Sequence, residues 1–114
     1  MKPITIKINS KSFDAFLLDN FIEWNIGLMF SPKKILVFDF KNKTDALIHM
    51  IFVFYPIYAI ALDKKRKVIN AKILYPFISF FKFSGDYLVE IPRGFIKLDE
   101  QIKKKEWNKI ILKW

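Results

Sequence analysis

The chain has 114 residues, enough for one domain with a modest core, so we expect a single domain over residues 1–114. Its 53% hydrophobic content excludes a disordered chain, and the absence of cysteine excludes disulfides, thiol nucleophiles and cysteine-ligated zinc. The net charge of +9 would attract nucleic acid or anionic lipid. Arginine, the preferred residue for bidentate phosphate contacts, occurs only as Arg66 and Arg93, which favours an ordinary lysine-rich surface.

The first third of the chain indicates three strands and one short helix. Apolar residues alternate with polar ones over residues 4–8 and again over 13–17, which predicts a hairpin. Asn20 is placed as a helix N-cap, and apolar residues at helical spacing follow over 21–28. Alternation returns over residues 35–40 and predicts a third strand.

The run Ala46 to Leu62 has seventeen residues without a charge. A transmembrane helix usually needs about 20 apolar residues, and β-branched and aromatic residues suit buried strands better. We therefore expect two strands, broken near Tyr55 and Pro56, and no membrane contact. Residues 57–62 are apolar on both faces, which predicts a strand covered on both sides.

The second half continues the β pattern. Residues 63–66 predict a chain reversal, and 68–74 the partner strand that follows it. Further strands are expected at 87–91 and 110–114, with a helix over 95–102 between them. The sequence thus predicts an α+β fold. It is a β-dominated, compact, barrel-like or sandwich sheet of about seven strands with two short helices.

Several short sequence motifs follow one another along the chain in an order and spacing that are characteristic when taken together. They are Gly27-Leu28-Met29-Phe30, Leu36-Val37-Phe38-Asp39-Phe40, His49-Met50, Tyr55-Pro56-Ile57, and Tyr87 to Pro92 followed by Gly94. From about Phe16 to Gly94 the chain resembles domain of unknown function 192. The resemblance implies a small, soluble, β-dominated domain without an assigned enzymatic activity. The chain departs from the family pattern where Ser31 and Tyr58 replace residues that are often charged in the family.

A binding site for a small ligand or a protein partner is the first functional hypothesis. Segment 77–83 is rich in Phe without a clear period, so it is either an exposed apolar patch or a loop folded over the core. The candidate residues for this site are His49, Met50, Tyr58, Tyr87, Phe80 and Phe81.

Two other functions stay open. A nucleic-acid-binding module would use the basic clusters Lys64, Lys65, Arg66, Lys67 and Lys103, Lys104, Lys105, which otherwise form a solvated hairpin tip and helix end. An enzyme would be centred on His49 and Glu90, although Glu90 is expected to face water. A lone histidine in a chain without cysteine cannot complete a set of three protein ligands for a metal unless carboxylates lie nearby.

No sequence motif points to a cofactor or a metal, since the three glycines lie far apart and no phosphate-binding loop occurs. The N-terminal residues contain no apolar stretch typical of a signal peptide, which together with the lack of cysteine predicts a cytoplasmic protein. We expect a non-enzymatic domain that binds a small molecule or a protein. The sequence does not identify that partner or the oligomeric state.

Overall fold

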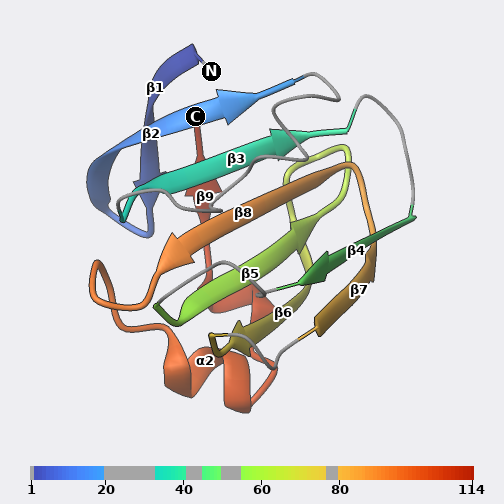
Figure 1. The fold of residues 1–114 in the computed structure, drawn as a ribbon. Coiled ribbons are helices and arrows are strands. Elements are labelled where there is room, and N and C mark those ends of the chain that lie inside the picture. Colours follow the sequence, from blue (N-terminus) through green and yellow to red (C-terminus); the bar gives the residue numbers. More distant parts are fainter. Residues whose placement is uncertain (1, 20–32, 41–44, 50–54, 77–79) are drawn as a thin grey trace.

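The computed structural model describes residues 2–19, 33–40, 45–49, 55–76 and 80–114 (Figure 1). Strands dominate them. In chain order the elements are β1 (Lys2–Ile8), β2 (Lys11–Leu18), β3 (Ile35–Asp39), β4 (Asp45–His49), β5 (Ile57–Leu62), β6 (Val68–Leu74), β7 (Phe80–Ser84), β8 (Tyr87–Pro92), α2 (Asp99–Lys103), the 3-10 helix η1 (Trp107–Lys109) and β9 (Leu112–Lys113).

Seven of these strands form one sheet in the order β6-β5-β8-β3-β2-β1-β9. The pairing of β2 with β3 is parallel and the other pairings are antiparallel. The sheet curls into a half-barrel, with α2 at one end, and β4 and β7 form a separate two-stranded sheet beside it (Figure 1). The predicted α+β, β-dominated fold is confirmed. The outermost strands of the sheet are β6 and β9.

Alternation along the strands divides the buried side chains between two clusters. The inner cluster fills the curl and includes Ile6, Val37 and Ile60, and it also takes up Leu98 and Ile102 from the α2 region. The outer cluster covers the convex face of the central strands; its members are Leu18, Leu36, Phe38, Phe40, Tyr55, Ile57, Ala59, Ala61, Leu74 and Leu88. Every residue of β5 is buried, as its two-sided apolar pattern predicted.

The β1–β2 hairpin also anchors the last strand. Asn9 lies in its two-residue turn with φ of 58°, a conformation that Asn tolerates better than most residues. The Asn9 N–H donates to the Ile111 carbonyl oxygen at 2.7 Å, and the Asn9 side-chain oxygen accepts the Ile111 N–H at 3.0 Å. These two bonds fix the start of β9 beside β1.

Some predicted elements differ from the observed ones. The helix predicted over 95–102 begins only at Asp99, because a turn closed by the Phe95 N–H and the Pro92 carbonyl precedes it. The strand predicted over 110–114 shortens to Leu112–Lys113, and β7 was not predicted. The helix predicted over 21–28 lies outside the described residues. Among the residues that are described, no helix has the length and apolar character that crossing a membrane requires.

Candidate functional site

A groove of about 770 Å³ lies between the two outermost strands of the curled sheet. We call it the seam groove. The residues that line it are Lys65, Arg66, Lys67, Val68, Trp107, Asn108, Ile110, Ile111, Leu112, Lys113 and Trp114. One wall is the β5–β6 turn with the start of β6, and the other is η1 with β9. Its volume falls within the range typical of ligand sites.

The β5–β6 turn is held in shape by its own aspartate. The Arg66 N–H donates to the Asp63 carbonyl oxygen at 2.9 Å. The Asp63 carboxylate accepts the N–H groups of Lys65 at 2.8 Å and Lys67 at 3.0 Å. Arg66 has φ of 61°, a left-handed position that suits Gly or Asn and costs other residues roughly 1 kcal/mol. The turn therefore carries an arginine where its backbone favours glycine.

The Arg66 side chain reaches across the seam groove. Its guanidinium donates to the main-chain oxygen of Trp114 at 2.7 Å. It also lies 4.2 Å from the centre of the Trp114 ring and 5.5 Å from the centre of the Tyr87 ring. The two rings meet edge to face at 5.3 Å. Because a cation over an aromatic face is attracted by the ring quadrupole, Arg66 joins the two walls without a backbone ladder.

The lining of the seam groove is basic and aromatic. Lys65, Lys67 and Lys113 are exposed on its walls, and the described lining contains no acidic residue. Trp107 packs against the inner cluster, and Ile110 and Leu112 are buried in it. An occupant with negative charge and a flat apolar group would match both properties of this surface.

The structure separates the two tyrosines that the sequence placed in one candidate site. Tyr58 pairs with Ile91, and Tyr87 pairs with Leu62, so they lie four residues apart along β8. That spacing is about 13 Å along a strand. Tyr87 adjoins the seam groove through Arg66, whereas Tyr58 lies at the opposite end of the curled sheet, near α2.

The other predicted ligand-site residues belong to the small second sheet. β4 and β7 pair with His49 opposite Phe80 and Ile48 opposite Phe81, so the backbone brings three of the candidates together. Met50 lies outside the described residues. No described residue of this sheet lines the seam groove, and a site at His49, Phe80 and Phe81 stays a prediction.

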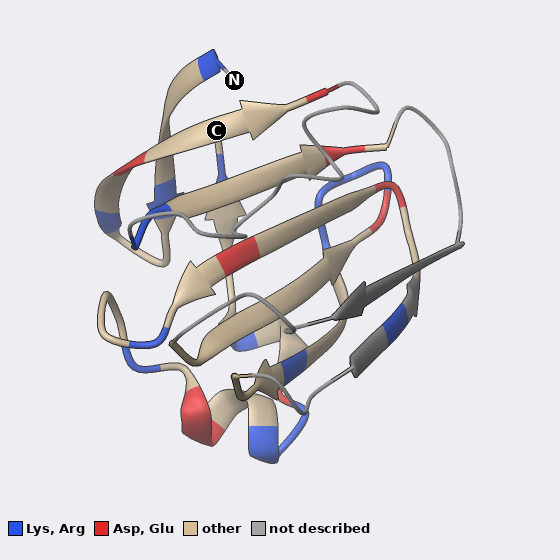
Figure 2. Ribbon diagram, in the orientation of Figure 1, with Lys and Arg blue, Asp and Glu red and all other residues tan. Residues whose placement is uncertain are grey.

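The two basic clusters lie at opposite ends of the molecule. Lys64 to Lys67 occupy the β5–β6 turn, whereas Lys103 ends α2 and Lys104 and Lys105 follow it (Figure 2). Lys65, Arg66 and Lys67 line the seam groove, where Lys113 joins them, and Lys103 to Lys105 do not. Sequence reasoning selected the first cluster but missed its aromatic partners, because Trp107 and Trp114 lie forty or more residues further along the chain.

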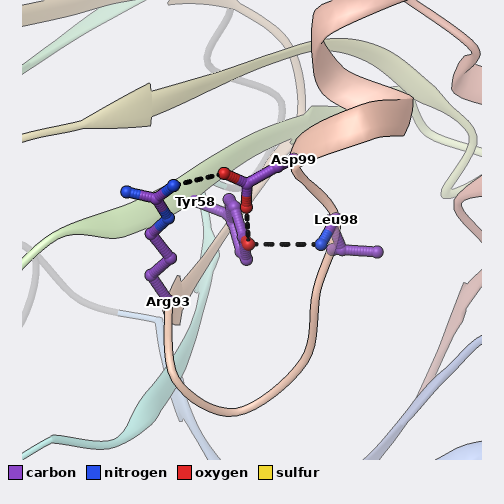
Figure 3. Close-up of polar contacts among 4 residues, drawn as sticks. All are labelled: Tyr58, Arg93, Leu98 and Asp99. Atoms are coloured by element: carbon purple, nitrogen blue, oxygen red, sulfur yellow. Dashed lines mark hydrogen bonds and ion pairs between the residues drawn. The ribbon is translucent and has the colours of Figure 1, made fainter.

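A second polar cluster docks α2 against the sheet (Figure 3). The Tyr58 hydroxyl donates to one Asp99 carboxylate oxygen and accepts the Leu98 N–H at 3.2 Å, and Arg93 donates to the other oxygen. The hydrogen bond from Tyr58 and the Arg93 guanidinium lower the pKa of Asp99. Burial, followed by the bond to Asp99, raises the pKa of Tyr58. Since both Asp99 oxygens are occupied by protein donors, this cluster is a structural clasp.

Glu90 is an acid within the outer cluster. Its position in β8 lies directly between Leu36 of β3 and Ala59 of β5, and only 4% of its surface is exposed. Burial raises its pKa to about 8. The same environment raises the pKa of Tyr55 to about 12, through burial and then the Glu90 charge.

The expectation that Glu90 faces water is therefore wrong. Its alternation in β8 is as predicted, but this face of the sheet is covered and not solvated. β4, which carries His49, belongs to a different sheet from β8. An enzymatic centre that joins His49 to Glu90 stays an untested hypothesis.

These features define a small domain built on one curled, β-dominated sheet with a basic groove at its seam. The chain belongs to the UPF0127 family. It is 33% identical to a UPF0127 protein of Pyrococcus furiosus over 99 residues, 82% of this chain and 85% of the relative. It is 35% identical to a UPF0127 protein of Pyrococcus horikoshii over 102 residues, 86% of this chain and 84% of the relative. Membership of an uncharacterised family is thus confirmed. No family model matches the chain, and the name domain of unknown function 192 stays a prediction.

Two solved structures share the fold at low sequence identity. A protein of unknown function from Novosphingobium aromaticivorans superposes with a TM-score of 0.75 at 17% identity, over 98% of this chain and 85% of that one. A putative transcription regulator from Sinorhizobium meliloti superposes with a TM-score of 0.71 at 12% identity, over 99% and 95%. At these identities the comparison supports the fold alone.

Proposed function

We propose that this chain is a non-enzymatic binding domain that holds an anionic partner with a flat apolar group in the seam groove. The observation that carries the proposal is the position of Arg66. It has a left-handed backbone and lies against the Trp114 and Tyr87 rings. The lack of cysteine suits a reducing compartment, so we propose that this binding takes place in the cytoplasm.

The charge of the groove supports an anionic occupant. Lys65, Arg66, Lys67 and Lys113 bring four cations to one surface, where an opposite charge would relieve their mutual repulsion. The aromatic side chains give this surface a second property that a solvated lysine cluster lacks. A planar group could stack on Trp107 or Trp114 while its acidic group contacts the lysines.

Anilinonaphthalene sulfonate is a suitable probe, because it combines flat rings with one anion. We expect the folded chain to bind one dye molecule, with energy transfer from tryptophan to the dye. The variant Lys65→Glu with Lys67→Glu should weaken binding about tenfold at low salt. The matched control is Lys103→Glu with Lys105→Glu, which makes the same change in net charge at residues that do not line the groove.

Equal loss in both double variants would show attraction by net charge alone and contradict the proposal. If the groove variant keeps full dye binding and the variant Phe80→Ser with Phe81→Ser loses it, the dye site lies on the small second sheet and not in the groove. Thermal unfolding of each variant, followed by circular dichroism, separates lost binding from lost folding.

A single-stranded nucleic acid is the second candidate, and one observation favours it. Lysines and tryptophans line the same groove, which is the combination that binds phosphates and stacks bases without sequence preference. The name of the Sinorhizobium structure, a putative transcription regulator, is compatible with this reading. A labelled oligothymidine should then bind with an affinity that falls steeply as salt rises.

A further inference from the structure

Both walls of the seam groove are edges of the same sheet. β6 and β9 end the strand order, and Val68 of β6 and Leu112 of β9 line the groove. In the ranges that the structure describes, no strand pairs with the outer side of either one. A free edge presents main-chain N–H and C=O groups that can pair with another extended segment.

The register of β9 shows which of its groups are available. Asn9 and Ile111 bond to each other, and Ile8 pairs with Leu112 as the next position. Bonded and non-bonded pairs alternate in an antiparallel ladder, so the N–H and C=O of Leu112 point away from β1 and toward the groove. The side chain of Leu112 is meanwhile buried in the inner cluster.

Other parts of the two edges are protected. Further along β6, the Asn70 side-chain oxygen accepts the N–H of Ala71 at 2.9 Å. At the end of the chain, the main-chain oxygen of Trp114 accepts the Arg66 guanidinium. Side chains that occupy edge groups prevent unwanted pairing. Inside the basic groove, the described contacts include no such side-chain cap on the outward main-chain groups of Leu112.

We propose that the seam groove accepts an extended acidic peptide, which adds to the free edge of β9 and pairs with Leu112. This inference rests on the proposed function and names its partner class. Successive side chains of an added strand point to opposite faces. One set would place carboxylates near Lys65, Lys67 and Lys113, and the other would place apolar groups against the apolar lining. A single-stranded nucleic acid would use the same cations and rings but has no amide ladder to offer.

The test uses the full chain and a fluorescein-labelled decapeptide of alternating Glu and Val, followed by fluorescence anisotropy. Two further peptides carry N-methyl groups on all Val or on all Glu residues, which removes alternate donors and preserves charge. Strand addition predicts that at least one methylated peptide binds about tenfold more weakly, the effect of one or two lost hydrogen bonds. Equal binding of all three peptides would overturn the inference.

A site-specific readout comes from amide hydrogen exchange measured by NMR. Saturation with the unmethylated peptide should slow exchange of the Leu112 N–H at least tenfold, on the order of one added hydrogen bond. The Ile111 N–H, already bonded to Asn9, should change little and serves as the internal control. Unchanged exchange at Leu112 in the saturated complex would refute strand addition.

The two proposals fail in different ways. If the dye binds the groove while the methylated peptides bind as well as the parent, the anionic site stands and strand addition is wrong. If oligothymidine displaces the peptide at equal salt and binds more tightly, the occupant is a nucleic acid and the peptide proposal is wrong. If neither dye nor peptide depends on Lys65 and Lys67, the groove is not the site and both proposals fall.

Discussion

Replacing Glu90 by Gln should make the protein more stable at alkaline pH and leave it nearly unchanged at acidic pH. Glu90 is 4% exposed, and burial raises its pKa from 4.5 to about 8. Between these two values the folded chain keeps a proton that the unfolded chain has released. Stability therefore falls as pH rises from about 4.5 to about 8, at roughly 1.4 kcal/mol per pH unit.

The magnitude follows from that slope. The difference of about 3.5 pH units corresponds to a loss of about 5 kcal/mol above pH 8, as an upper limit. A domain of this size has a free energy of unfolding of about 5–15 kcal/mol, so the effect is readily measured. Gln has nearly the same shape but no charge, so Glu90→Gln removes this pH dependence. Below about pH 5 the two proteins should agree within about 1 kcal/mol.

The assay is urea unfolding followed by circular dichroism at several pH values from about 5 to 9. The quantity compared is the difference in unfolding free energy between variant and parent, in which the other titrating groups cancel. Glu100→Gln is the matched control. Glu100 is exposed, and its bond to Lys104 lowers its pKa, so its replacement should give no gain at alkaline pH. A Glu90→Gln difference that is constant across this range would refute the reasoning.

Three further substitutions test the groove and the contacts around it. Arg66→Gly should change the unfolding free energy by about 1 kcal/mol or less, since relief of the left-handed backbone offsets the lost contact with Trp114. The same variant should weaken dye binding about tenfold. Unchanged dye affinity would contradict the role of Arg66. Tyr58→Phe should lower the unfolding free energy in urea by about 1–3 kcal/mol, because its hydroxyl makes two hydrogen bonds; a neutral result would show that the clasp is not needed to dock α2. Asn9→Gly keeps the turn but loses the side-chain oxygen that accepts the Ile111 N–H, so exchange of that N–H should accelerate at least about fivefold. Unchanged exchange would show that β9 is held by other contacts.

Alternation in the sequence was sufficient to predict most of the sheet. It predicted the β1–β2 hairpin, because burial on one face leaves a period of two in the residues, and a run that is apolar on both faces predicted the fully covered strand β5. It did not predict β7, whose Phe-rich sequence has no clear period. The helix expected over 95–102 begins later, at Asp99, for a local and a tertiary reason. Residues 92–95 form a turn, and the tertiary clasp at Asp99 then sets where α2 begins.

The candidate groove could not be read from the sequence, although one of its walls could. The cluster Lys64 to Lys67 is visible as a charge run, but its meaning depends on Trp114, forty-eight residues away from Arg66. The strand order places β6 and β9 at the two ends of the sheet, and the curl then brings these ends toward one another. Local periodicity specifies neither the order nor the curl. The burial of Glu90 was missed for the same reason, since covering of the outer face is a tertiary property.

The seam is closed by side chains where a complete barrel would use backbone pairing. Backbone pairing between β6 and β9 would occupy Leu112 and leave no groove. A bridge made by Arg66 instead spans the seam through one guanidinium and two rings, and Leu112 keeps its main-chain groups directed into the gap. The same arginine thus stabilises the half-barrel and supplies charge to the groove. That double role gives a physical reason for an arginine at a turn position where glycine would cost less.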